Sequence, residues 1–344
     1  MRTLTERDLN RALLARQLLL EPATLPLPRA LERVAGLQMQ YAPSGYIGLW
    51  SRVAGFARDD LTRALEHRRV VQGTMMRITI HLVASRDYWP LTESIRESRR
   101  ESWLKGHRGR VDPRRVQAAA SRTRNLLADG PRARGELVEA LGVDNVVWGG
   151  VGLWLDLVRV PPCGTWERRR ADIYALAEQW VGPPSVDAAV ALDHLVRRYL
   201  GGFGPASVTD LVSWSGIPRS RLAPALERLR LRRFRDEQGG ELLDVSRAPL
   251  PDPDTPAPVR FLPTWDAALL VHARRTQVLP ERYRSRVFNT KTPHSTETFL
   301  VDGQVAGTWK HERGRVRIEP FERLSRERRR EVDEEAERLA EFLA

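Results

Sequence analysis

Ser207–Leu229, which reads SVTDLVSWSGIPRSRLAPALERL, contains the clearest indication of the fold. Ser207 is a favoured N-cap residue, so we expect a helix over 208–214, and Gly216 supplies the turn that follows it. Pro218 lies just inside the start of a second helix over 219–229, where its missing N–H costs little. Residues 231–245, with Gly239-Gly240 at their centre, have the pattern of a β-hairpin. This order of elements is typical of a winged-helix domain.

Two earlier parts of the chain repeat this order less clearly. In the first, helices over 6–20, 29–37 and 59–67 precede two β segments between Val70 and Ala84. In the second, helices over 114–127, 135–141 and 145–158 precede a turn at Pro161-Pro162. The third copy begins with a helix over 186–200. We therefore predict an α+β fold of three tandem winged-helix modules, over 1–110, 111–184 and 185–247.

The remaining residues have a different character. Five prolines between Ala248 and Pro258 predict a stiff linker. Asp302-Gly303 is a strong turn signal between two β segments, and 315–318 has the pattern of a further strand. A helix over 326–343 has an apolar stripe on one face. We predict a small C-terminal β-barrel domain with this helix over 259–344.

The composition limits the possible partners and the compartment. The 344 residues carry a formal net charge of +12, which favours a polyanion such as DNA, although it is also compatible with an arginine-rich solvated surface. The single cysteine, Cys163, excludes an intramolecular disulfide and favours a reducing compartment. No apolar run has the length of a membrane span, and the N-terminus lacks a signal core. We expect a soluble cytoplasmic protein with no membrane partner.

Gln38-Met39-Gln40 is the leading candidate for a chemical site. Residues two apart project to the same side of an extended segment but not of a helix, and Gly36 and Pro43 favour an extended chain here. Two amides offer carbonyl acceptors and N–H donors, so together they can hold a water in attack geometry. The plainer alternative is that both amides satisfy backbone groups at a helix end. The seven scattered histidines show no metal-ligand spacing, and we expect neither a metal nor a cofactor.

Several basic residues are candidate DNA contacts. Arg77, Thr79 and His81 alternate with apolar residues, which predicts a strand whose polar face presents Arg77 and His81 to DNA. An ordinary solvated strand face fits the pattern equally well. The other candidates lie after the second turn and at the start of the third module's second helix: Arg168, Arg169, Arg170, Arg219 and Arg221. For the first three, a solvated loop is the alternative.

The chain resembles the AlkZ/YcaQ-type winged-helix DNA glycosylases. The resemblance rests on Leu37–Gln40, on Gly48–Arg52 and on Met76–Val83, and it extends through residues 162–170, 204–216, 261–272 and 288–309. The triplet Gln-Met-Gln resembles the AlkZ-like branch. Ile78 departs from the pattern, because we expect glycine there.

The resemblance implies tandem winged helices around a DNA channel, a C-terminal β-barrel, and monofunctional cleavage of the N-glycosidic bond at alkylated purines in double-stranded DNA. It also implies that Gln38 and Gln40 orient the water that attacks C1′. Some members of the family open interstrand crosslinks or protect antibiotic producers. We expect a monomer. The main alternative is a winged-helix transcriptional regulator, which would prefer one duplex sequence, and the third possibility is a scaffold protein that uses its C-terminal helix.

Overall fold

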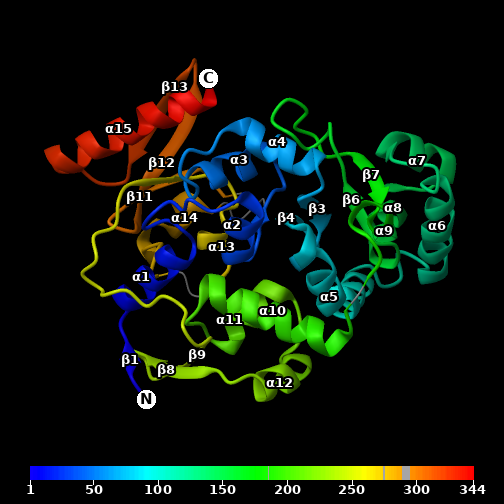
Figure 1. Cartoon of the computed structure of the whole chain (residues 1–344), viewed down its shortest axis with the longest axis horizontal. Helices are drawn as coiled ribbons and strands as arrows, with labels where there is room; N and C mark the ends of the chain where they lie inside the picture. Colours follow the sequence, from blue (N-terminus) through cyan, green and yellow to red (C-terminus); the bar gives the residue numbers. More distant parts are fainter. Residues whose placement is uncertain (185, 274–275, 289–294) are drawn as a thin grey trace.

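The computed structural model describes residues 1–184, 186–273, 276–288 and 295–344 as a mixed α+β protein (Figure 1). Its N-terminal part begins with a short strand and two helices and continues to a long helix. These elements are β1 (Thr3–Leu4), α1 (Glu6–Arg16), α2 (Leu27–Arg33), β2 (Leu37–Gln38), α3 (Ala42–Trp50), α4 (Arg58–Glu66), β3 (Val70–Thr74), η1 (Met76–Ile78), β4 (Ile80–Ala84) and α5 (Ser85–Gly106). The sequence pattern did not identify α5, a helix of 22 residues with Pro90 inside it.

The next part of the chain joins the first part through one sheet. Its elements are α6 (Pro113–Leu126), β5 (Arg132–Ala133), α7 (Arg134–Leu141), α8 (Asn145–Trp154), β6 (Leu157–Arg159), β7 (Ile173–Leu176) and α9 (Ala177–Val181). The six strands run in the order β2-β4-β3-β6-β7-β5, and β3 pairs antiparallel with β6. The first two predicted modules therefore share a continuous sheet. Figure 1 shows α6, α7 and α8 at one end of the molecule.

The third part follows the sequence prediction closely. It contains α10 (Ala188–Phe203), α11 (Val208–Ser215), α12 (Arg219–Arg228), β8 (Arg232–Asp236) and β9 (Glu241–Asp244). Ser207 caps α11 by accepting from the backbone N–H of Asp210, whose carboxylate accepts from the Ser207 N–H in return. The N-terminal strand β1 pairs with β8, and a fully buried ion pair between Arg16 and Asp244 fastens α1 to β9.

The C-terminal part is an open sheet with a helix alongside it. Its elements are β10 (Arg260–Leu262), α13 (Ala267–Leu270), η2 (Glu281–Tyr283), α14 (Arg284–Val287), β11 (Thr298–Val301), β12 (Gln304–Glu312), β13 (Arg315–Pro320) and α15 (Arg326–Leu343). The strands run β10-β11-β12-β13, and within the described residues no pairing closes them into the predicted barrel. Val332 and Leu339 of α15 pack with Phe261 and Phe299 of the sheet.

Part of the arginine excess is internal. Arg11, Arg16 and Arg52 are almost fully buried, and each forms an ion pair with a carboxylate from a distant part of the chain. These pairs join elements that are distant in the sequence. In the described parts of the chain, no helix is both long and apolar enough to cross a membrane.

Candidate functional site

The Gln38-Met39-Gln40 segment is extended, as its sequence predicts. Helix α2 ends at Arg33, and Gly36 turns the chain with φ +79°. A Cβ at Gly36 would lie 2.8 Å from the side chain of Val83, so this close approach also requires glycine. The chain then enters β2, where Gln38 lies opposite His81 of β4.

The turn between β3 and β4 holds the amide of Gln38, and the first residue of β4 holds the amide of Gln40. Gln38 is 9% exposed, and its Oε1 accepts a hydrogen bond from Arg77 Nη2 at 3.2 Å. Gln40 is exposed, and its Oε1 accepts from the backbone N–H of Ile80 at 3.1 Å. Because both partners are donors, each carbonyl oxygen faces its partner and each NH2 group faces away. Every Oε1 keeps a second lone pair for a further donor.

The two neighbours of Gln40 lie in different environments. Met39 is buried, and its backbone N–H donates to the carbonyl of Ile80 at 2.8 Å. Tyr41 is 41% exposed, and its hydroxyl accepts from Arg169 Nη1 at 2.9 Å. The loop between β6 and β7 therefore contacts the glutamine segment. Sequence reasoning missed Tyr41 because its partner lies 128 residues away.

Arg77 and Ile78 do not lie in the predicted strand. They form a tight turn with φ +53° and φ +60°, and the regular strand begins only at Ile80. A left-handed backbone costs about 1–3 kcal/mol at such residues. The turn is closed by backbone hydrogen bonds from Met75 to Thr79 and from Ile78 to Met75. In this turn Arg77 forms two hydrogen bonds: Nη1 donates to the carbonyl of Trp214 in α11 at 3.0 Å, and Nη2 donates to Gln38.

His81 is a buried neutral imidazole and not a surface contact. It is 3% exposed, and burial, helped by the charge of Arg77, lowers the pKa of His81 to about 3. Nδ1 lies 3.1 Å from the carbonyl oxygen of Thr79, so this nitrogen carries the proton and Nε2 is an acceptor. The His81 ring therefore cannot donate a proton from Nε2 to a leaving base.

The other predicted basic residues differ in their availability. Arg168, Arg169 and Arg170 lie on an exposed loop, where Arg169 also stacks over Trp166 at 5.5 Å. Arg219 is exposed at the start of α12. Arg221 instead points to α5, where it donates to Glu101 at 2.6 Å and to Ser98 at 3.1 Å. The structure therefore brings Arg77, His81 and Arg169 to the glutamine segment, and it engages Arg221 with α5.

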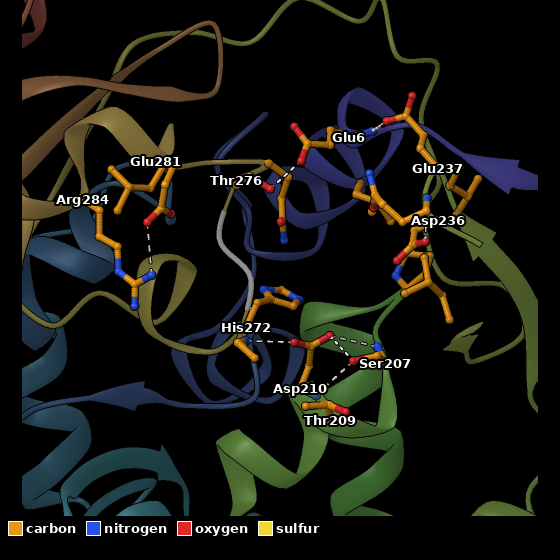
Figure 2. Close-up of a pocket in the computed structure, with 18 residues that line it drawn as sticks. Glu6, Ser207, Thr209, Asp210, Asp236, Glu237, His272, Thr276, Glu281 and Arg284 are labelled. Carbon is orange, nitrogen blue, oxygen red and sulfur yellow. Dashed lines mark hydrogen bonds and ion pairs between the residues drawn. The ribbon is translucent and has the colours of Figure 1, made fainter. Parts of the chain in front are cut away.

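A separate cavity of about 490 Å³ lies between α1, α11 and the residues that follow α13 (Figure 2). It is rich in carboxylates, and these are engaged within the chain. Asp210 accepts from the backbone N–H groups of Ser207 and Ala273, and Glu6 accepts from Thr276. Their negative charge disfavours phosphate, so this cavity is a poor site for DNA. Among the described residues, no group of three or more His, Cys, Asp or Glu is placed to hold a metal ion.

Comparison with known proteins identifies the family of the chain. A model of the AlkZ-like family, described as DNA glycosylase AlkZ-like, matches residues 31–342. The chain belongs to the AlkZ-like DNA glycosylase family. This match confirms the predicted enzyme class, a DNA glycosylase, and the AlkZ-like branch that the triplet Gln38-Met39-Gln40 indicated.

A sequence match and a structural match, both to a glycosylase of Streptomyces sahachiroi, show how far this glycosylase has diverged. It is 24% identical over 357 residues to the interstrand DNA cross-link repair glycosylase of Streptomyces sahachiroi, covering 93% of this chain and 92% of that protein. Its structure matches that of Streptomyces sahachiroi DNA glycosylase AlkZ with a TM-score of 0.83 at 21% identity, over 99% of this chain and 97% of the other. The structural match shows that this chain and the Streptomyces sahachiroi protein have the same fold.

Proposed function

We propose that this glycosylase hydrolyses the N-glycosidic bond of alkylated purines in double-stranded DNA, with Gln38 and Gln40 positioning the attacking water. The observation that carries the proposal is that one short connection, through Arg77 and Ile80, holds both amides. Residues two apart on an extended segment project to the same side, so the two amides can serve one water. We further propose that the protein acts as a monomer built from three winged-helix modules, over 1–110, 111–184 and 185–247, followed by the domain over 259–344.

The proposed chemistry suits a substrate with a good leaving group. An amide does not titrate usefully, so neither glutamine can act as an ordinary general base. An N7-alkylated guanine is cationic, and cleavage of its bond to C1′ returns the electron pair to the base, which leaves as a neutral molecule. Water adds to C1′ and releases its proton to solvent, giving an abasic sugar. The amides contribute by positioning, which can lower the barrier by several kcal/mol.

The DNA contacts are proposed from exposure and position. Arg169 lies beside Tyr41 and the glutamine segment, with Arg168 and Arg170 on the same loop. Arg219 is exposed on a separate helix. Guanidinium groups bind phosphate through two parallel N–H donors, so these four residues fit backbone contacts. The relative from Streptomyces sahachiroi is named for repair of interstrand crosslinks, and we propose that bulky N7 adducts and crosslinks are substrates here also.

Single-turnover base release tests the proposal. Duplexes carrying N7-methylguanine, a bulky N7 adduct and an interstrand crosslink are compared with the spontaneous rate. We expect release from wild-type protein, and the methyl-to-bulky ratio separates general repair from self-resistance to a genotoxic product. Gln38→Ala with Gln40→Ala should abolish release and leave DNA affinity nearly unchanged, whereas Gln304→Ala, at an exposed position on β12, should behave as wild type.

Two outcomes would contradict the proposal in different ways. Wild-type release by the double variant would remove Gln38 and Gln40 from the chemistry. No release from any lesion, together with tight binding to one undamaged sequence, would favour the transcriptional regulator.

A further inference from the structure

A second, smaller cavity lies where α5, α8 and the end of β3 meet. Its volume is about 90 Å³, and it shares no lining residue with the acidic cavity. About 10–15 Å³ of such volume is enough to hold one water, so the space can hold several waters or one tetrahedral oxyanion. The lining residues that matter here are Thr74, Ile78, Arg99, Gly149, Asp156 and Arg159.

Two guanidinium groups meet in this cavity at Thr74. Arg99 is 6% exposed and donates to the carbonyls of Thr74 and Gly152. Arg159 donates from Nη1 to the Thr74 hydroxyl at 2.9 Å and stacks on Tyr174 at 5.0 Å. The Nε atoms of both arginines are buried and have no hydrogen-bond partner among the described residues. The bonds of these arginines therefore go to neutral groups, and part of their donor capacity is unused.

The local charge is not balanced within the chain. Asp156 is the acidic residue of the lining, and it accepts two hydrogen bonds of 2.9 Å from Arg96, which also pairs with Glu93. These two carboxylates do not balance the positive charges of Arg96, Arg99 and Arg159. Burial lowers the pKa of Arg99, and it outweighs the nearby charge of Asp156, which raises this pKa; the charges of Arg96 and Arg100 lower it further. A buried cation is stable only with a compensating partner. An anion in the cavity would supply this charge.

We propose that this cavity binds a phosphate group of the DNA backbone through Arg99 and Arg159. The choice of DNA rests on the proposed function. Gly149 lines the cavity and is exposed, so an anion can enter beside α8. Ile78 lines the same cavity, and the adjacent Arg77 holds Gln38. A phosphate seated here fixes the strand relative to the turn that positions the glutamine amides.

Salt dependence of binding to an undamaged duplex tests this site. Arg159→Gln removes one charge from the lining, and the matched control Arg100→Gln removes one from a neighbouring side chain that donates to Leu153 and lies outside the lining. Each phosphate contact contributes about 0.9 to the slope of log K against log salt. We expect Arg159→Gln to reduce the slope by about one contact and Arg100→Gln to leave it unchanged. An unchanged slope for Arg159→Gln, or an equal loss in both variants, would overturn the proposal.

A second measurement identifies the source of the anion. Melting temperature is compared in phosphate and in chloride at equal ionic strength, and phosphate should stabilise wild-type protein more than Arg159→Gln. Gly149→Leu keeps every charge and adds a bulky side chain at an exposed residue of the lining, where the new Cβ meets no atom within 4 Å, so the variant should fold normally. We expect its side chain to obstruct the entrance and to reduce both effects. Stabilisation by phosphate with no change in the DNA slope would mean a free-anion site and overturn the assignment to DNA. No stabilisation and no slope change would mean that the cavity holds water. Neither measurement needs base release, so failure here is distinct from failure of the glycosylase proposal.

Discussion

Two of the tight turns with consecutive residues at positive φ are built from opposite kinds of residue. Asp302 and Gly303 join β11 to β12 with φ +48° and +80°. Arg77 and Ile78 lie between β3 and β4 with φ +53° and +60°. Aspartate and glycine tolerate this backbone, whereas a β-branched isoleucine is a genuine outlier there.

The two turns also differ in what they contact. Asp302 forms ion pairs with Arg7 and Arg11 of α1, so this turn joins the C-terminal sheet to the N-terminal helix. Arg77 contacts Gln38 and the backbone of Trp214, so the other turn joins the glutamine pair to α11. The comparison indicates that the turn which only joins two parts of the fold has residues suited to its backbone. The strained residues lie in the turn that positions a side chain against the glutamine pair.

The largest expected effect is on the structural turn. A Cβ at Gly303 would lie 2.5 Å from Asn10 and 2.7 Å from Leu14, in addition to the strain of φ +80°. Gly303→Ala should lower the free energy of unfolding in urea by about 3 kcal/mol. Gly314→Ala is the matched control, because Gly314 has φ +74° with no atom within 4 Å, and it should cost only about 1 kcal/mol. Equal losses would mean that the contact with α1 contributes nothing.

The next largest effect is on the excision rate, after a substitution in the Arg77-Ile78 turn. Arg77→Met keeps the aliphatic stem but removes the donors that hold Gln38 and bind Trp214. Misplacing a positioned group can cost about 100-fold in rate, so single-turnover excision should fall by about this factor while the DNA dissociation constant changes only a few-fold. Arg330→Met, on exposed α15, removes the same charge and should leave the rate unchanged. A loss of affinity at an unchanged rate would make Arg77 a phosphate contact, as its sequence pattern first indicated.

Local signals in the sequence predicted much of this fold. The cap at Ser207, the turn at Asp302-Gly303 and the helix over 326–343 are all found as predicted. Each depends on residues close in the chain whose backbone preferences agree with the structure. The Arg77-Ile78 turn could not be predicted in this way, because alternation of polar and apolar residues mimicked a continuous strand.

Long-range contacts in the candidate site escaped prediction for a related reason. The bond from Arg169 to Tyr41 joins residues 128 apart, and the bond from Arg77 to Trp214 joins residues 137 apart. Neither depends on spacing within one element. The prediction that Gln38 and Gln40 form the site came from their chemistry and from the resemblance, while only the fold shows which donors hold their carbonyl oxygens.

A third prediction concerns the strands that leave the two turns. The pKa of His81 in the folded protein is about 3, well below the ordinary 6.5, so only the unfolded chain takes up this proton between those values. Stability should therefore fall with pH below 6.5, and His81 should contribute about 1.4 kcal/mol per pH unit. His81→Asn should flatten the dependence of unfolding free energy on pH between 6 and 4. His311→Asn, exposed on β12, should retain the wild-type slope. Identical slopes for all three proteins would place His81 in solvent.

The smallest expected effect on stability tests the comparison most directly. Ile78→Gly relieves about 1–2 kcal/mol of backbone strain, but it loses the packing of a partly buried side chain against the cluster around Trp148 and adds chain entropy to the unfolded state. These contributions oppose each other, so the free energy of unfolding should change by less than about 1 kcal/mol. The freed turn should hold Arg77 less firmly, and excision should slow several-fold. Ile78→Asn accepts the left-handed backbone with less freedom than glycine, so its rate should lie nearer to wild type. A different result would contradict this interpretation: Ile78→Gly would raise the free energy of unfolding by about 2 kcal/mol or more and keep the wild-type excision rate. The backbone strain would then have no role in positioning Arg77 against Gln38, and the contrast between the two turns would be accidental.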